Sequence, residues 1–277
     1  KKMIKKIFQI YQEESFEGIK RRLIIRYWLI KFIILKFFKK QIVNSYYGVK
    51  LNSNYSDATF RFYMTGFYGD EYWKHITDKK QSFIFLDIGA NQGLYTLCAA
   101  MNKNCIACFS FEPVLRTFSL LQKNVTINDL SGKCHLINKA ISNKSGYSNI
   151  SIKADHSGVA SMCSGNNLTR DTNNIIEKIE AISSTELDSL ISNENKVELI
   201  VKIDVEGFEM NVIKELLKTQ MANDISEIYF EVNERWVNYN DIETLLKSNG
   251  YKFFSKIPYF LSCILAIKTK FDETSIF

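Results

Sequence analysis

The feature that most constrains the fold is an apolar segment that runs through a glycine turn into a helical segment. Residues 83–88 read FIFLDI, a pattern typical of a strand buried on both faces of a parallel sheet. Gly89 and Gly93 follow in the sequence GANQG, and residues 94–101 suit a helix. Glycines at these positions allow a sharp turn and a close approach to the helix start. This frame is typical of a nucleotide site, although an ordinary strand-to-helix turn would share it.

The same alternation continues along the chain. Strand-like segments are expected at residues 106–113, 135–138, 198–204 and 227–232, with helical segments at residues 114–128 and 210–217. Strands that alternate with helices indicate an α/β fold with a parallel sheet. Ligands of such sheets bind outside the carboxyl ends of the strands. The residues that end each strand are therefore the candidates for a site.

Two acids at these strand ends indicate which nucleotide would fit. A dinucleotide-binding fingerprint needs glycine where Asn91 and Leu94 stand, and the acid Asp87 is poorly placed beside a pyrophosphate. A ligand with an ammonium and a sulfonium group, such as S-adenosylmethionine, suits that carboxylate better. Glu112 follows Asp87 by 25 positions, close to the spacing at which an acid binds ribose hydroxyls. The sequence therefore favours a methyl donor over NAD.

A second group of acids follows the later strands. Residues 198–204 read ELIVKID, so that Lys202 and Asp204 point to the same face of a strand. A buried unpaired charge is costly, so these two must pair with each other or with a ligand. Glu206 comes just after this strand and Glu231 near the end of the next. Three carboxylates could therefore line one cleft.

Together these motifs resemble the FkbM family of S-adenosylmethionine-dependent methyltransferases. The resemblance covers roughly residues 83–251 and lies in FLDIGANQGLYTL (85–97), FEP (111–113), LQKNVTIN (121–128), KAIS (139–142), TELDSL (185–190) and LIVKIDVEGFE (199–209). It implies a Rossmann-like class I methyltransferase fold, a mostly parallel seven-stranded sheet with helices on both faces. Strands near residues 251–255 and 261–266 would complete the sheet, the last one antiparallel. The first 60 residues and, in detail, residues 142–175 fall outside the resemblance.

The resemblance also implies an activity, methyl transfer to a hydroxyl oxygen of a sugar or of a polyketide-type metabolite. It would place the ribose at Glu112, the adenine near Lys139 and Ala140, and the transferred methyl near Asp204. The methionine part of the donor would be held by Asp87, Gly89, Asn91 and Gly93. Ala90, Tyr95 and Pro113, from the same motifs, complete the expected donor-binding set.

Methyl transfer to a sugar needs a general base, because a sugar hydroxyl does not ionise at pH 7. Asp204 is the first candidate, Glu231 or Glu206 the second, and His156 a further one on a loop. Lys202 could orient Asp204 or stabilise the developing alkoxide. Alternatively, Asp204 only holds the donor and Lys202 pairs with it structurally. A divalent metal shared by the three acids is a further option, since hard cations take oxygen ligands, but none is expected.

The chain divides into a basic front end and a mildly acidic body. Residues 1–40 contain 12 basic and three acidic residues, whereas the whole chain has 36 and 30. A uniformly basic nucleic-acid binder would not show this division, so no nucleic-acid partner is expected. We expect an N-terminal basic amphipathic helical segment with short strands over residues 1–80 and an S-adenosylmethionine-dependent methyltransferase domain over residues 81–277, as the resemblance implies.

The front end contains the most apolar stretch of the chain, LIIRYWLIKFIILKFF at residues 23–38. It is too short and too charged for a bilayer span, and it lacks the uncharged core of a signal peptide. As a helix, residues 20–40 suit peripheral contact with a membrane, or packing on the body or on a second subunit in a homodimer. Short strands are expected within residues 43–64, and Asp70 could cap a helix that extends through Ile76.

Residues 142–174 are rich in Ser, Asn and Gly. We interpret them as short strands with a lid over the acceptor, or as a plain surface excursion. The six cysteines are scattered, and Cys105 and Cys108 are interpreted as two buried apolar residues rather than a redox or metal pair. This usage fits a cytoplasmic protein, free or peripheral at the inner face of the membrane.

Three functions remain open at this point. The first is O-methylation of a sugar in a bacterial surface polysaccharide or its lipid-linked precursor. The second is O-methylation of a soluble secondary metabolite, a polyketide or a glycoside. The third is a non-catalytic, donor-binding interaction module.

Overall fold

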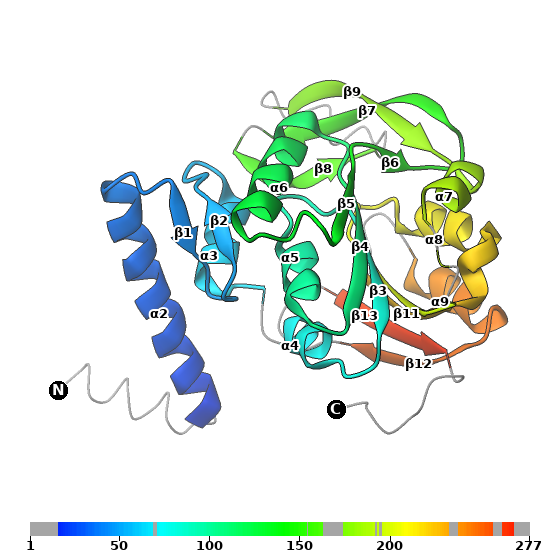
Figure 1. The fold of residues 1–277 in the computed structure, drawn as a ribbon, viewed down its shortest axis with the longest axis horizontal. Coiled ribbons are helices and arrows are strands. Elements are labelled where there is room, and N and C mark those ends of the chain that lie inside the picture. Colours follow the sequence, from blue (N-terminus) through cyan, green and yellow to red (C-terminus); the bar gives the residue numbers. More distant parts are fainter. Residues whose placement is uncertain are drawn as a thin grey trace.

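The computed structural model describes residues 16–68, 71–153, 155–162, 174–191, 193, 196–232, 238–256 and 262–268. Its centre is a seven-stranded sheet (Figure 1). In the order in which they pair, its strands are β12 (Tyr251–Lys256), β13 (Ser262–Lys268), β11 (Ile225–Val232), β10 (Glu198–Ile203), β3 (Phe83–Ile88), β4 (Cys105–Phe111) and β5 (Cys134–Ile137). β13 runs antiparallel to both of its neighbours, and the other pairs are parallel. The predicted mostly parallel sheet with an antiparallel last strand is confirmed.

Helices cover both faces of this sheet because its strands are apolar on both. All six residues of β3 are buried, and its first four residues belong alternately to two different hydrophobic cores. One core includes residues of α4 (Glu71–Asp78), α5 (Leu94–Met101) and α6 (Leu115–Ile127). The other includes residues of α7 (Ser184–Leu190), α8 (Glu209–Lys218) and α9 (Tyr239–Ser248), with the short 3-10 helix η1 (Gln220–Asn223) after α8.

A second sheet forms from the segment between β5 and α7. Its strands pair in the order β6 (Ala140–Ile141), β9 (Asn174–Ile182), β7 (Gly146–Lys153) and β8 (His156–Ser161). The short strands expected within residues 142–174 are therefore present. His156, expected on a loop, lies instead at the start of β8. Residues 163–173 of the expected lid lie outside the described residues.

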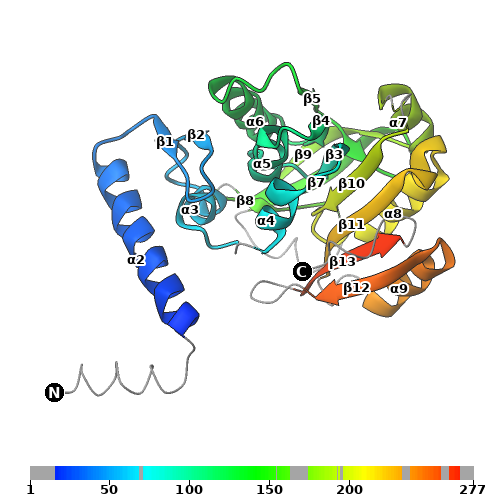
Figure 2. The ribbon, with the colours of Figure 1, turned by 60° about the horizontal axis from the view of Figure 1, so that its bottom comes forward.

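The first described element of the N-terminal part is α2 (Phe16–Phe37), which lies to one side of the body (Figures 1 and 2). A hairpin of β1 (Ile42–Asn44) and β2 (Lys50–Asn52) follows, as expected. The helix α3 (Ala58–Thr65) was not expected, because the loose alternation of residues 43–64 suggested strands throughout. Asp57 caps its start and Gly66, at φ 74°, ends it.

These N-terminal elements share a hydrophobic core with α4, α5 and α6, through residues such as Leu51 and Phe60. Asp70, the expected cap of α4, lies outside the described residues, as does Leu261 before β13. In the described part of the chain, no helix is long and apolar enough to cross a membrane. The described cysteines are all buried and unpaired, and the Sγ atoms of Cys105 and Cys108 are 3.5 Å apart.

Asp57 connects three parts of the chain that are distant in sequence. Its Oδ1 accepts hydrogen bonds from Phe60 N at 3.0 Å, Gln92 Nε2 at 3.0 Å and Ser157 Oγ at 3.2 Å. Its Oδ2 accepts one from Ser157 N at 2.8 Å. Because Asp57 is only 5% exposed, water cannot replace these bonds. This carboxylate therefore joins α3 to the glycine turn after β3 and to β8.

We expect Asp57→Ala to lower the free energy of unfolding by about 3 kcal/mol, because it removes a helix cap and leaves buried donors without an acceptor. Urea unfolding followed by circular dichroism measures the loss. Asn238→Ala is the matched control, since Asn238 is exposed and caps only its own helix, α9. Its cost should be about 1 kcal/mol. Equal losses in the two variants would contradict a connecting role for Asp57.

Candidate active site

A cavity lies at the carboxyl ends of the central strands, between the central sheet and the second sheet. The loops after β3, β4 and β10 and the start of β6 provide Gly89, Asn91, Glu112, Pro113, Lys139, Ala140, Asp204 and Glu206. The second sheet and the segment just after it provide Ile150, Ser157, Gly158, Ala160 and Met162. Tyr63 and Tyr68 come from α3 and the segment after it. The cavity thus occupies the position at which α/β sheets bind ligands.

The structure brings together about half of the residues that the sequence indicated. The eight strand-end residues named above were all predicted site residues. The remaining predicted residues lie outside the cavity lining: Asp87, Ala90, Gly93, Tyr95, Lys202, Glu231 and His156. Tyr63, Tyr68 and Ser157 line the cavity without having been predicted, because only tertiary packing brings them to the strand ends.

Gly89 shapes the wall of the cavity through a contact between two strand ends. It adopts φ 76°, and a Cβ at this position would lie 1.9 Å from the carbonyl oxygen of Asp204. Gly93, at φ 93°, has a different neighbour, since its Cβ would lie 2.4 Å from Leu121 Cδ1 of α6. The first glycine therefore allows the turn to touch the end of β10, and the second allows α5 to approach α6.

The buried ammonium of Lys202 contacts the same two strand ends. The side chain is 3% exposed, and its Nζ donates to the carbonyl oxygen of Gly89 at 2.8 Å. It also lies 3.2 Å from Asp87 Oδ1 and 3.5 Å from Asp204 Oδ2. Burial lowers the pKa of Lys202, but the two carboxylates outweigh burial, and the net pKa lies above its usual value. The expected pairing of Lys202 with Asp204 is thus present, with Asp87 as a further partner.

Asp87 is an internal anchor of the turn. It is fully buried, and its Oδ2 accepts hydrogen bonds from Thr96 N at 3.0 Å and Thr96 Oγ1 at 2.7 Å. Its other oxygen faces Lys202. These contacts hold the start of α5 against β3. They explain why the motif has an acid at this position even if Asp87 contacts no ligand. Its expected contact with the donor stays a prediction.

Glu112 places a carboxylate in the cavity wall at the end of β4. Its oxygens accept hydrogen bonds from Asn91 N and Val114 N, each at 2.9 Å. Burial raises the pKa of Glu112 to about 7, although these N–H groups and Lys202 lower it. Each carboxylate oxygen has a further lone pair, so Glu112 could also accept a hydrogen bond from a hydroxyl group of a ligand.

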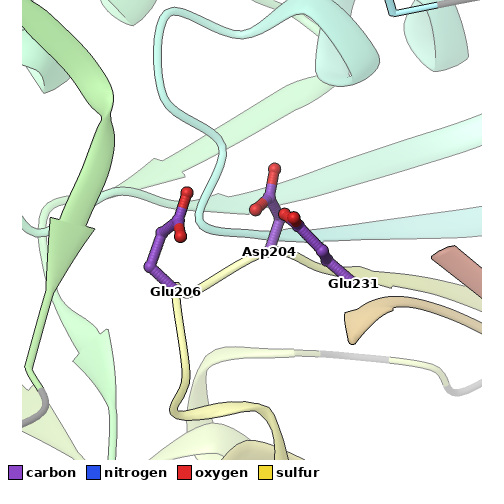
Figure 3. A group of neighbouring side chains, drawn as sticks. All are labelled: Asp204, Glu206 and Glu231. Atoms are coloured by element: carbon purple, nitrogen blue, oxygen red, sulfur yellow. The ribbon is translucent and has the colours of Figure 1, made fainter. Parts of the chain in front are cut away.

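Asp204, Glu206 and Glu231 form a carboxylate trio (Figure 3). One oxygen from each residue lies within 4.8 Å of the others. Burial and then repulsion by Asp204 raise the pKa of Glu206 to about 8 and that of Glu231 to about 9. Glu206 and Glu231 therefore retain protons near neutral pH. The trio could exchange a proton with a ligand, and its geometry could also hold a divalent cation.

Two further titratable groups, Tyr68 and His156, differ in their positions relative to the cavity. Burial, followed by repulsion from Asp204, Glu231 and Glu206, raises the pKa of Tyr68 well above its usual value. This cavity-lining phenol therefore stays protonated. His156 packs edge-on against Phe62, with ring centroids 5.9 Å apart, and partial burial lowers its pKa. Because it lies outside the cavity lining, it is a weaker candidate for the base than Asp204 and Glu206, which line the cavity.

Comparison with known proteins relates the central part of the chain to one family. The model of the family described as the methyltransferase FkbM domain matches residues 87–253. A search of the curated proteins found no match.

Several solved structures are similar to this chain. The methyltransferase FkbM of Methylobacillus flagellatus KT is 14% identical, with 78% of this chain and 56% of that chain covered and a TM-score of 0.48. This chain thus spans little more than half the length of that protein. TrmK of M. capricolum, in complex with S-adenosyl-homocysteine, is 14% identical, with 72% and 68% covered and a TM-score of 0.43. TYW2 of M. jannaschii, in complex with AdoMet, is 14% identical, with 82% and 84% covered and a TM-score of 0.43.

The contact at Gly89 makes this turn intolerant of a side chain. We expect Gly89→Ala to lower the free energy of unfolding by about 3–5 kcal/mol, since backbone strain adds to a clash with a carbonyl that cannot move freely. Gly48→Ala is the control, because Gly48 has φ 80° but no atom within 4 Å of the added Cβ. Strain alone should cost it about 1–2 kcal/mol. If urea unfolding shows equal losses, the contact with Asp204 does not constrain the turn.

The raised pKa values of the trio predict a pH-dependent stability. Between about pH 5 and the folded pKa values of about 8 and 9, the folded chain holds protons at Glu206 and Glu231 that the unfolded chain has released. The contribution of these groups to stability therefore decreases as pH rises through this window. Glu206→Gln/Glu231→Gln should accordingly gain stability relative to the wild type as pH rises from 5 to 9.

Thermal or urea unfolding at several pH values measures this difference. Asp129→Asn, at an exposed position, controls for the loss of a negative charge from the surface. A difference between the double variant and the wild type that stays constant with pH would show that the carboxylates are not crowded in the folded chain.

Proposed function

The chain belongs to the FkbM methyltransferase domain family, whose model matches more than half of its length, and on this basis we propose that it transfers a methyl group from S-adenosylmethionine to a hydroxyl oxygen. The observation that carries the proposal is the position of Asp204. It lies at the end of β10 in the cavity wall, beside the buried ammonium of Lys202 and two further carboxyls.

The charges of the cavity wall support a donor that is cationic and lacks phosphate. Among the described lining residues, Glu112, Asp204 and Glu206 are acidic, and Lys139 is basic. The Nζ of Lys139 lies 2.5 Å from Glu180 Oε1, so its charge is already compensated. A pyrophosphate would meet the carboxyl groups of Glu112 and Asp204 here, and no uncompensated cation among the described lining residues, whereas a sulfonium and an ammonium would be attracted to these carboxyl groups.

We assign the donor contacts along the strand ends. Gly89 and Asn91 would hold the methionine part, Glu112 the ribose hydroxyls, and Lys139 with Ala140 the region of the adenine. When bound, the donor supplies a methyl group already activated by a positive sulfur. The protein must then align the acceptor and remove one proton.

Asp204 is our first choice for the group that accepts this proton. Lys202, at 3.5 Å from Asp204 Oδ2, fixes the orientation of the carboxylate from the buried side. Glu206 and Glu231 are the second choice, because their raised pKa values mean that they hold protons near neutral pH. In this arrangement Asp204 can pass the proton that it has taken up to Glu206 or Glu231 as that residue releases its own.

For the acceptor, we propose a sugar hydroxyl of a bacterial surface polysaccharide or its lipid-linked precursor. A soluble polyketide or glycoside is the alternative within the same chemistry. A non-catalytic module is disfavoured by the trio, because a protein that only binds the donor has no use for three crowded carboxyls at a strand end.

The proposal is tested with a labelled methyl donor and a panel of glycan, lipid-linked and metabolite acceptors, with the product located by mass spectrometry. Asp204→Asn keeps the size of the side chain and removes its basicity. We expect turnover to fall by about 10²–10⁴-fold. The control Asp241→Asn, at an exposed position on α9, should leave it unchanged.

Unchanged turnover in Asp204→Asn would exclude Asp204 as the base. A methyl group found on nitrogen or carbon, or none on any hydroxyl acceptor, would contradict the proposed reaction. Turnover that requires an added divalent cation would favour metal binding by the trio over proton exchange.

A further inference from the structure

The helix α2 has two apolar faces, and only one of them is used by the body. On the inner face, Phe32 is 7% exposed, with its ring centroid 5.7 Å from that of Tyr55 and 6.2 Å from that of Phe60. Trp28, one turn earlier, lies 6.0 Å from the ring of Tyr46. These aromatic contacts attach the helix to the hairpin and α3.

The opposite face, which we call the outer face of α2, is covered by large apolar side chains. Each of the following is between 50% and 79% exposed: Leu23, Tyr27, Ile30, Ile33, Ile34 and Phe37 of the helix, and Phe38 directly after it. At 100° per residue these positions fall within an arc of about 140° on one side of the helix. A continuous exposed apolar surface of this kind marks an interaction site, because isolated exposed apolar residues do not line up on one face.

Basic residues lie along both borders of the outer face. On the helical projection, Arg22 and Lys36 follow one border and Lys31 the other, where its Nζ lies 3.8 Å from the ring centroid of Trp28, while Arg26 falls inside the arc. From residue 18 to residue 37 the helix contains no acidic residue. The outer face is therefore an apolar stripe between two positive borders.

The charges decide between the two kinds of surface that could cover this stripe. In a face-to-face dimer, the borders of two copies would bring like charges together, with no acid between residues 18 and 37 of the helix to compensate them. An anionic bilayer surface can form both interactions. Its apolar interior accepts the apolar stripe, and its negative headgroups attract the basic residues of the borders. Long Lys and Arg stems can extend from an apolar surface to the headgroups.

We propose that the outer face of α2 binds the surface of a bilayer that contains anionic phospholipids, with the helix lying in the headgroup region. The inner face holds the body to this surface through α3, and α3 also provides Tyr63 to the cavity. The helix α3 thus contacts both α2 and the cavity. This inference concerns the partner of α2 and does not depend on the reaction proposed above.

Vesicle co-sedimentation of the full chain tests the proposal. Vesicles of phosphatidylcholine alone are compared with vesicles that also contain phosphatidylglycerol, at 0.1 M and 0.5 M salt. The wild type should bind the anionic vesicles more tightly, and high salt should weaken this binding. Ile30→Gln/Ile34→Gln should reduce the affinity by about tenfold or more, because it removes apolar area from the middle of the stripe.

Met101→Gln/Ile106→Gln is the matched control. Met101 is 56% exposed and Ile106 is 50% exposed, but both residues lie on the body. It should bind as the wild type does, and circular dichroism should show both variants folded. The proposal is overturned if the wild type does not bind anionic vesicles, or if the α2 variant binds them as well as the control. It is also overturned if light scattering without lipid shows a dimer that Ile30→Gln/Ile34→Gln dissociates.

Discussion

The buried ammonium of Lys202 is the interaction on which the site depends. A lysine that is 3% exposed needs compensating partners, and it finds them in the carbonyl of Gly89 and in the carboxylates of Asp87 and Asp204. These groups belong to the turn after β3 and to the end of β10. Their attraction to one cation holds the two strand ends in contact, and Gly89 allows the contact because it has no Cβ. The positions of the cavity wall and of Asp204 follow from this arrangement.

The central fold could be predicted because its strands are buried on both faces and end in turn residues. The bounds of β3 and α5 agree with the sequence pattern, and the order of elements indicated a parallel sheet. The helix α3 could not be recognised from periodicity, because its apolar residues are interrupted as in a strand. The cap residues Asp57 and Gly66 were the available signal for it. His156 was expected on a loop because its segment is polar, but pairing with β7 makes it part of a strand.

In the candidate site, only the residues at the ends of strands could be predicted from the sequence. Asp204, Glu206 and Glu112 reach one cavity because the carboxyl ends of parallel strands meet at one edge. Whether an acid faces the ligand or the interior depends on its neighbours, which the sequence does not reveal. Asp87 faces Thr96 and Lys202, so the negative charge of the cavity wall comes from other acids. Tyr63 and Tyr68 of the N-terminal segment reach the cavity only through tertiary packing, which the sequence pattern does not indicate.

The central claim is that this cavity accepts a cationic methyl donor and not a dinucleotide. Isothermal titration calorimetry of the purified chain with S-adenosylmethionine, S-adenosylhomocysteine and NAD tests it most directly. We predict binding of the donor and its product, no binding of NAD, and a weaker affinity for the donor in Glu112→Gln, by about 1.5–3 kcal/mol. Binding of NAD, with no heat from either sulfur compound, would contradict the account.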